Sequence, residues 1–380
     1  MKILHVYKSY YPFSMGGVEK YIYSLSESLY EKGIESAILT TKKEAPAHTG
    51  SVGKSTVYYY PANMEKASCP ISWPLLKNFR GIAKGYDLLH YHFPWPFADL
   101  TYLLTLTNKP MVVTYHSDII RQKYLKIGYH PIMRLFLNRA QAIIASSANY
   151  LQSSPVLNQY RQKTSIIPFG LDRAQYPPAP DMLIRHWRHR VGEGFFLFVG
   201  VLRYYKGLHF LLEAVRDTPI RVVIAGAGTE ETELLRLKAE KKLTNVTFVG
   251  RITEPDKAAL YHLCRASVVP SHLRTEAFCI SLLESLIYGK PAISTELNTG
   301  TSFVNQHRVS GLVVPPADPV ALRQAMQLLL TDENVYQPLK QGAQSHYQQY
   351  FTADLMRQKH IDLYQSIRRT GHRYFGGDRR

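Results

Sequence analysis

Lys2-Ile3-Leu4-His5-Val6-Tyr7 is followed by the glycine pair Gly16-Gly17 and then by apolar residues at helical spacing. The opening run is typical of a buried β-strand. The residues after the glycines fall on one face of a helix with 3.6 residues per turn: Val18, Tyr21, Ile22, Leu25 and Leu29. A strand, a glycine-rich loop and a helix in this order predict the first unit of a parallel α/β sheet.

Short β-branched or aromatic runs recur about every 25 to 35 residues, which is the interval of a strand, a crossover helix and two loops. The first series predicts strands near residues 2–7, 36–40, 56–60, 87–91, 110–115, 142–146 and 164–168. The second series predicts strands near residues 195–201, 220–225, 245–249, 266–270, 290–294 and 311–314. Because 380 residues exceed the size of a single core, we expect two parallel-sheet domains, 1–168 and 169–354, divided where turn formers and prolines follow the seventh strand.

The net charge of +17 is unevenly distributed. Residues 1–167 hold 19 Lys and Arg against 9 Asp and Glu (+10), and the remainder holds 27 against 20 (+7). A basic first half favours an anionic partner, which could be nucleic acid, an anionic membrane surface or a phosphorylated substrate. General solubility is the alternative explanation. No recognisable nucleic-acid-binding motif occurs, so we expect no nucleic-acid partner.

The cysteines and the longest apolar runs indicate the compartment. Cys69, Cys264 and Cys279 have neither the paired spacing of a zinc site nor that of a disulfide framework, which predicts a reducing cytosol. The apolar run at the start is too short for a signal peptide, and no run approaches the roughly 18 apolar residues of a membrane span. We expect a cytoplasmic protein that is soluble or peripheral to the membrane.

Glu276 and Glu284 bracket the apolar segment 277–283, which is expected to open a helix. If the whole segment is helical, the two carboxylates are offset by about 12 Å along the axis, comparable with the reach from the ribose to the sugar of a nucleotide sugar. The N–H groups of a helix N-terminus attract phosphate without a cationic side chain. This spacing predicts a site for a long phosphorylated ligand.

Three further motifs lie at the ends of expected strands. Arg203 and Lys206 lie on a turn after the strand at 195–201, where they could stabilise a departing diphosphate or simply be exposed cations. No Asp-x-Asp occurs, which fits cations acting in place of a metal ion. His116 could hydrogen-bond a sugar hydroxyl or be structural, and Gly16-Gly17 could let the backbone approach a phosphate or form a tight turn.

A second glycine cluster, Ala225-Gly226-Ala227-Gly228, also follows an expected strand. The dinucleotide fingerprint requires a third glycine at position 231, where Glu231 stands. No NAD or FAD cofactor is therefore expected, and no other cofactor is predicted.

Taken together, the motifs at Gly16-Gly17, His116, Arg203/Lys206 and Glu276-x7-Glu284 resemble the retaining GT-B glycosyltransferases of family 4. The resemblance covers nearly the whole chain and includes residues 288–291 and 311–316. More narrowly, residues 115–123, 203–207 and 299–302 resemble bacterial mannosyltransferases of O-antigen and capsule assembly. The resemblance implies two Rossmann-like parallel-sheet domains facing an interdomain cleft, with a C-terminal helix at about 355–380 crossing back onto the first domain.

The resemblance also implies a role for each matching residue. Glu276 would hold hydroxyls of the donor sugar, and Glu284 would hold the ribose hydroxyls. Arg203 and Lys206 would bind the diphosphate, and His116 would lie beside the transferred sugar. The family pattern thus makes Glu276, His116, Arg203 and Lys206 the catalytic candidates, with no metal ligand. Backbone N–H groups around four positions would meet the sugar and the phosphates: Phe278, Cys279, Ile280 and Ser281. The backbone at Ile252 would contact the nucleotide base, and Gly16 and Gly17 would border the donor cleft from the first domain.

Two positions depart from the family pattern. Val201 stands where the family usually has an arginine that binds phosphate, and Arg203 could reach instead. Cys279 stands where glycine is common, so the backbone must accommodate a Cβ near the donor.

The expected enzyme is a retaining, metal-independent hexosyltransferase with an acceptor-binding first domain and a donor-binding second domain. The best interpretation is transfer of mannose from GDP-mannose to a lipid-diphosphate-linked oligosaccharide at the inner face of the cytoplasmic membrane. UDP-hexose, UDP-N-acetylglucosamine or GDP-rhamnose as donor stays open, as does a catalytically silent nucleotide-sugar-binding protein. Residues 73–80 and 124–127 mix aromatic and basic side chains, as on a helix resting on anionic lipid or on an ordinary packed helix.

Overall fold

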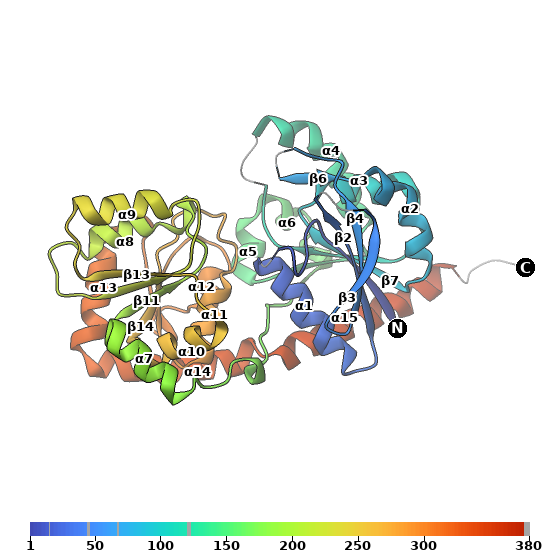
Figure 1. The fold of residues 1–380 in the computed structure, drawn as a ribbon. Coiled ribbons are helices and arrows are strands. Elements are labelled where there is room, and N and C mark those ends of the chain that lie inside the picture. Colours follow the sequence, from blue (N-terminus) through green and yellow to red (C-terminus); the bar gives the residue numbers. More distant parts are fainter. Residues whose placement is uncertain (15, 44–45, 67, 120–122, 376–380) are drawn as a thin grey trace, which may run out of the picture. The chain divides into compact units, whose positions relative to one another are not determined.

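The computed structural model describes residues 1–14, 16–43, 46–66, 68–119 and 123–375. It divides into two compact units, each built on a sheet flanked by helices (Figure 1). The N-terminal unit comprises Met1–Gly170 and Ala353–Arg380, and the C-terminal unit comprises Leu171–Thr352. The last helix of the chain therefore belongs to the N-terminal unit.

The N-terminal unit has an eight-stranded sheet in the order β10-β9-β8-β7-β1-β2-β4-β3. Its strands are β1 (Lys2–Val6), β2 (Glu35–Lys42), β3 (His48–Val52), β4 (Ser55–Pro61), β7 (Leu88–Phe93), β8 (Met111–Tyr115), β9 (Ala142–Ala145) and β10 (Thr164–Ile166). Its helices are α1 (Gly17–Tyr30), α2 (Trp73–Lys84), α3 (Pro96–Thr105), α4 (Lys123–Arg139), α5 (Ala148–Ser153), α6 (Pro155–Gln159) and α15 (Ala353–Phe375). Every pairing within this eight-stranded sheet is parallel except that of β3 with β4.

The C-terminal unit has a six-stranded parallel sheet in the order β13-β12-β11-β14-β15-β16. Its strands are β11 (Phe196–Val199), β12 (Val222–Ala225), β13 (Val246–Gly250), β14 (Ala266–Val269), β15 (Ala292–Thr295) and β16 (Gly311–Val314). Its helices are α7 (Asp181–Val191), α8 (Leu208–Ala214), α9 (Glu231–Glu240), α10 (Glu254–Leu263), α11 (Ile280–Ile287), α12 (Thr301–Val304), α13 (Pro319–Thr331) and α14 (Glu333–Tyr350).

The predicted parallel α/β organisation is confirmed, and each of the thirteen expected strands is present within about two residues at either end. Three short strands were missed: β3, and the hairpin of β5 (Met64–Lys66) and β6 (Cys69–Ile71). β3 is a largely exposed edge strand that contains Gly50, and β5 has no buried residue. Such segments lack the apolar pattern by which a buried strand is recognised.

Side chains alternate between the two faces of each sheet, because successive residues of a strand point to opposite sides. In β7, Tyr91 packs edge-on against Tyr102 of α3 and Phe136 of α4. Its neighbour His90 points to the other face, where it meets Tyr364 of α15. β11 divides likewise, because Phe196 and Phe198 join one hydrophobic cluster while Phe195 and Leu197 join another.

Each sheet has a point where the strand order reverses, and ligands of open α/β sheets bind at the carboxyl ends of the strands there. In the N-terminal unit this point lies at β1, with β7 on one side and β2 on the other. In the C-terminal unit it lies between β11 and β14. The loops after β11 and β14 carry Arg203, Lys206 and Glu276.

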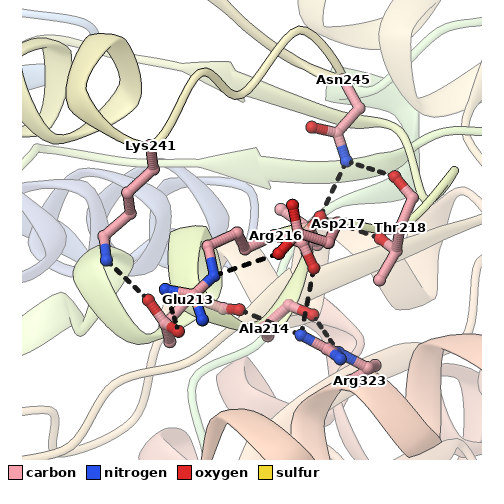
Figure 2. A network of polar contacts seen from close by, with 9 residues as sticks. Glu213, Ala214, Arg216, Asp217, Thr218, Lys241, Asn245 and Arg323 are labelled. Carbon is pink, nitrogen blue, oxygen red and sulfur yellow. Dashed lines mark hydrogen bonds and ion pairs between the residues drawn. The ribbon is translucent and has the colours of Figure 1, made fainter.

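A polar network at the opposite, amino ends of the strands holds the turn between α8 and β12 (Figure 2). The side-chain amide of Asn245, just before β13, donates to the carbonyl oxygens of Val215, Thr218 and Ile220 at 2.8–3.0 Å. Arg323 of α13 donates to the carbonyl oxygens of Ala214 and Arg216. These contacts satisfy carbonyl groups of the turn, so this polar network has a structural role.

α2 is a packed amphipathic helix. Leu75 and Phe79 are fully buried, whereas Trp73, Lys77 and Arg80 are exposed. The side chains of residues 124–127 lie outside what the structure describes, as do residues 120–122 of the motif at 115–123. Among the described helices, none combines the length and the apolar character needed to cross a membrane.

Candidate active site

Glu276 and Lys206 form a buried ion pair at the reversal point of the C-terminal sheet. Lys206 Nζ lies 2.5 Å from Glu276 Oε2, and the two side chains are only 10% and 8% exposed. Ser271 Oγ donates to the same carboxylate oxygen at 2.9 Å. Burial alone would lower the pKa of Lys206, but the charge of Glu276 outweighs it and raises that pKa. Within the described part of the chain, Oε1 of Glu276 has no partner, so it can accept a hydrogen bond from a ligand hydroxyl.

The turn that carries Lys206 depends on Gly207. This glycine has φ +69°, and a Cβ there would lie 2.1 Å from the carbonyl oxygen of Pro270. The backbone of Tyr205 also accepts a hydrogen bond from His272 N at 2.9 Å, which joins the loops after β11 and β14. The close approach of these loops is what brings Lys206 to Glu276.

Arg203 lies on the same turn, with its side chain exposed. No ion pair or hydrogen bond engages its guanidinium among the residues whose structure is known. Val201 is also exposed, at 51%. The guanidinium of Arg203 is therefore available to an anionic ligand. This is the residue that the sequence analysis expected to replace the phosphate-binding arginine that the family usually has at the position of Val201.

Glu284 lies on the buried face of α11 and pairs with Lys257 of α10 at 2.8 Å. Lys257 also pairs with Glu254 at 2.7 Å. Tyr176 donates to Glu284 at 3.4 Å, and burial followed by the charge of Glu284 raises the pKa of this phenol. The second carboxylate is thus held by a cation of its own.

The segment between the two glutamates opens a helix, as expected, but the segment is not helical throughout. α11 begins at Ile280, and residues 276–279 form an irregular turn, so the axial offset of a full helix does not apply. No side chain caps α11, and its first turn holds no acidic residue. The N–H groups of Ile280 and Ser281 are therefore free of side-chain caps at the end of the helix that attracts anions.

Cys279 accounts for the late start of α11. It has φ +68° and ψ +91°, a backbone conformation that residues with a Cβ rarely adopt. Its side chain is 6% exposed, and its Sγ lies 3.2 Å from Ser281 Oγ. The preceding residue Phe278 packs edge-on against Phe351. The position thus has a backbone conformation that favours glycine while carrying a buried side chain.

Replacing Cys279 with valine is expected to lower the free energy of unfolding by about 2 kcal/mol, because β-branched residues are strained at positive φ. Cys279→Gly should fold with little loss of stability. The control is Cys264→Val, since Cys264 is equally buried but has φ −70°, and it should cost less than about 1.5 kcal/mol. Urea unfolding monitored by circular dichroism gives the comparison, and equal losses for the two valine variants would contradict it.

The predicted position Ile252 and the glycine cluster at 225–228, where no dinucleotide was expected, lie at the ends of the neighbouring strands β13 and β12. Ile252 follows β13 and packs partly buried against the cluster that contains Phe195. The glycines at 226 and 228 serve packing, since a Cβ would lie 1.9 Å from Gly200 O in the first case and 2.2 Å from Leu202 O in the second.

The remaining predicted residues lie in the N-terminal unit. His116 follows β8, is partly exposed, and meets Tyr21 of α1 edge-on with ring centroids 5.2 Å apart. Gly16 and Gly17 are exposed at the start of α1. A Cβ on Gly16 would lie 2.5 Å from the carboxylate of Glu19, which is buried and accepts hydrogen bonds from Ser9 and Ser14.

Four residues at these sites were not predicted from the sequence. Lys257, Tyr176 and Ser271 bind the two glutamates, and His92 hydrogen-bonds His116. Each comes from an element whose own pattern is that of ordinary packing, so only the tertiary fold brings it into place.

Comparisons with known proteins agree with this architecture. The structure resembles that of Anabaena HepE in complex with UDP, with a TM-score of 0.77, 19% identity and coverage of 96% of this chain and 100% of that one. It also resembles sucrose-phosphate synthase from Thermosynechococcus elongatus, with a TM-score of 0.78, 21% identity and coverage of 96% and 98%. Two Rossmann-like units of this kind define the GT-B fold of glycosyltransferases.

The sequence comparisons identify the family. Residues 15–175 match the family model described as Glycosyltransferase Family 4, and residues 182–346 match the model described as Glycosyl transferases group 1. A D-rhamnosyltransferase, WbpZ of Pseudomonas aeruginosa, is 47% identical over 353 residues, 93% of each chain. The O-antigen chain mannosyltransferase C of Escherichia coli is 43% identical over 368 residues, 97% of this chain and 99% of that one. The chain belongs to this family of GT-B glycosyltransferases, and it is a glycosyltransferase.

Proposed function

We propose that the protein transfers mannose from GDP-mannose, with retention of anomeric configuration and without a metal ion, to a lipid-diphosphate-linked oligosaccharide of bacterial surface polysaccharide. The observation that carries the donor side is the buried Lys206–Glu276 pair at the reversal point of the C-terminal sheet. The relative that transfers mannose to an O-antigen chain is 43% identical over nearly the full length, which supports the sugar and the acceptor class.

In this proposal the C-terminal unit binds the donor and the basic N-terminal unit binds the acceptor. Glu276 accepts a sugar hydroxyl at its unpartnered Oε1, and Glu284 binds the ribose. The diphosphate lies at the uncapped start of α11, where backbone N–H groups attract anions. Lys206 keeps its contact with Glu276 and turns another N–H towards the phosphate, since an ammonium group has three donors.

The leaving diphosphate gains negative charge as its bond to the sugar breaks. Lys206 and the unpaired Arg203 stabilise that charge by charge-assisted hydrogen bonds, each contributing about 1.5–3 kcal/mol. A phosphate oxygen of the donor removes the proton from the acceptor hydroxyl, and the new glycosidic bond forms on the face that the diphosphate leaves. No side chain forms a covalent intermediate in this scheme.

GDP-rhamnose is the second candidate donor, because the relative that is 47% identical is a D-rhamnosyltransferase. The two sugars differ at C6, where mannose has a hydroxyl group that the 6-deoxy sugar lacks. Product analysis with each donor therefore separates the two assignments.

The test is transfer by the purified protein to a synthetic lipid-diphosphate-linked acceptor, with GDP-mannose, GDP-rhamnose, UDP-glucose and UDP-N-acetylglucosamine compared in the presence of EDTA. We expect a mannosylated product whose NMR coupling shows retention. Binding of GDP-mannose without turnover on any acceptor would instead indicate a silent sugar-nucleotide-binding protein. Accumulation of a covalent sugar adduct would refute the role of the donor phosphate.

Arg203→Ala should reduce kcat by about 10- to 150-fold, the range that corresponds to 1.5–3 kcal/mol. The stability of the protein should hardly change, because the guanidinium forms no hydrogen bond or ion pair with the described residues. Arg185→Ala is the matched control, since Arg185 is also exposed and unpaired there but lies on α7. A comparable loss in both variants would show that only overall charge matters.

A further inference from the structure

Three histidine side chains in the N-terminal unit form a hydrogen-bonded chain that ends at His116. His5 Nδ1 lies 3.1 Å from His92 Nε2, and His92 Nδ1 lies 3.0 Å from His116 Nε2. The ring planes of the two pairs are inclined by only 22° and 21°. His5 and His92 are fully buried, whereas His116 is partly exposed. The chain therefore runs from the interior of the unit to its surface.

The strands explain why these rings meet. His5 and His90 are register partners on the adjacent strands β1 and β7, and His92 lies two residues further along β7, on the same face. His116 follows the end of β8 directly. Parallel strands in register thus place the four imidazoles on one face of the sheet, beneath α1 and α15.

The hydrogen-bonded histidines lie in uncharged surroundings. The rings are faced by phenols and by another imidazole: Tyr7 after β1, Tyr21 of α1 and His90 of β7. His90 in turn hydrogen-bonds Tyr364 of α15 and Thr114 of β8, and its ring centroid lies 5.9 Å from that of His360. No carboxylate bonds to any of these histidines within the described residues. Burial lowers the pKa of His5 to about 3 and that of His116 to about 3, so each ring is neutral and carries a single N–H.

A chain of neutral imidazoles can point its N–H groups in only two directions. If His116 donates from Nε2, then His92 donates to His5, and His5 must carry its proton on Nε2. That atom is buried and has no partner among the described residues, so this arrangement leaves a buried N–H group without an acceptor. If His5 donates from Nδ1 instead, its Nε2 carries only a lone pair. A buried N–H group without an acceptor is rarer in proteins than a buried acceptor without a donor. The second arrangement is therefore favoured.

We infer that His5 and His92 are positioning residues that fix His116 as the Nδ1–H tautomer, so that His116 donates a hydrogen bond to an oxygen of the bound sugar and cannot act as a base. This rests on the proposed function, in which His116 lies beside the transferred sugar. Its Nε2 lone pair is occupied by the N–H of His92, and its Nδ1 carries the proton. Neither nitrogen can then accept the proton of the acceptor hydroxyl.

A metal ion is the competing interpretation, because one nitrogen from each of His5, His90 and His92 lies within 4.8 Å of the others. The hydrogen bonds count against it. Both ring nitrogens of His90 meet hydroxyl groups, Tyr364 at 2.7 Å and Thr114 at 2.6 Å, and both nitrogens of His92 meet other histidines. Only Nε2 of His5 offers a lone pair that is not already used.

The first test is ¹⁵N NMR of the whole protein labelled at histidine, since protonated and unprotonated ring nitrogens differ strongly in chemical shift. We expect the signals that disappear in His116→Asn to show a protonated Nδ1 and an unprotonated Nε2. A protonated Nε2 on His116 would overturn the inference, as would one equivalent of zinc per chain in elemental analysis of the purified protein. This readout requires no activity, so it stands apart from a failure of the proposed function.

The second test separates positioning from packing. His92→Phe should lower kcat by about tenfold, equivalent to about 1.4 kcal/mol, while the affinity for GDP is unchanged. His90→Phe is the matched control, because it lies on the same strand and is equally buried but does not bond to His116, so kcat and the tautomer should stay as in the wild type. His5→Asn, whose amide can donate in place of Nδ1, should retain more activity than His5→Phe. An unchanged kcat in folded His92→Phe, or equal losses in the two His5 variants, would overturn the inference.

Discussion

Lowering the pH from 7 to 5.5 is expected to unfold the N-terminal unit before the C-terminal unit. Four histidines of the N-terminal unit are fully buried: His5, His90, His92 and His360. Burial, followed by the neighbouring histidines, lowers the pKa of His5 to about 3 and holds those of His90 and His92 well below the usual value. Burial also lowers the pKa of His360, to about 4, against the opposing effect of its hydrogen bond to the Met356 carbonyl.

The direction of the effect follows from where protons bind. The unfolded chain takes up protons near pH 6.5, whereas the folded unit keeps these rings neutral. Their stabilising contribution is complete above pH 6.5 and is lost as the pH falls towards the folded pKa values. Asp99 has the opposite effect. Burial raises the pKa of its carboxyl to about 8, so in this pH range the folded unit holds one proton that the unfolded chain has released. His116 adds a fifth histidine, because burial lowers its pKa to about 3 as well. Five histidines less one carboxyl give a net loss of roughly 5 kcal/mol per pH unit, large beside a typical stability of about 5–15 kcal/mol.

Hydrogen exchange measured by mass spectrometry between pH 7 and 5 resolves the two units. Peptides from β1, β7 and α15 should lose protection first. The C-terminal unit has one comparably buried histidine among its described residues, His346, so its stability should change by only about 1.4 kcal/mol per pH unit. His90→Phe should reduce the slope of the N-terminal unit by a similar amount. Equal loss of protection in both units would contradict the prediction.

Lys206→Met is expected to destabilise the C-terminal unit by about 3–5 kcal/mol and to abolish sugar transfer. Removing one partner of a buried ion pair leaves the other charge without compensation. Here that charge is Glu276, whose side chain is only 8% exposed. The double variant Lys206→Met/Glu276→Gln should recover most of the stability, because no buried charge remains, but should recover no activity.

The matched control is Lys241→Met. Lys241 pairs with Glu213 at 2.7 Å, but the two side chains are 27% and 34% exposed, so water screens the pair and the loss should be below about 1 kcal/mol. Hydrogen exchange of C-terminal peptides in urea gives the stability, and transfer assays give the activity. If Lys206→Met were no more damaging than Lys241→Met, the buried pair would have no special role.

Much of the fold followed from the period of the apolar residues. Strands such as β7 and β11 are continuous apolar or aromatic runs between turn formers, and their pattern is unambiguous because both faces are buried. The edge strand β3 and the strand β5 were missed because their side chains are largely exposed. β6 was missed with them because it has only three residues, one of them buried. The spacing of apolar residues predicts a strand only where at least one of its faces is buried.

The candidate site could be predicted at the level of its charged residues but not of their partners. Arg203, Lys206 and Glu276 stand at strand ends, which the alternation of strands and helices locates. The partner Lys257 comes from another helix, and no spacing relates it to Glu284. The late start of α11 depends on the backbone at Cys279, and a cysteine in a sequence carries no sign of a positive φ.

The assignment of α15 to the N-terminal unit sets a rule for protein engineering. Tyr21 and His90 find their partners, His360 and Tyr364, more than 270 residues further along the chain. A fragment that stops at Gly170 would lose these hydrogen bonds and expose the buried groups that α15 contacts, so it should be insoluble unless residues 353–375 are supplied. Chimaeras that exchange the N-terminal unit between relatives must therefore transplant two separate pieces of gene, the first 170 codons and the codons of the last helix.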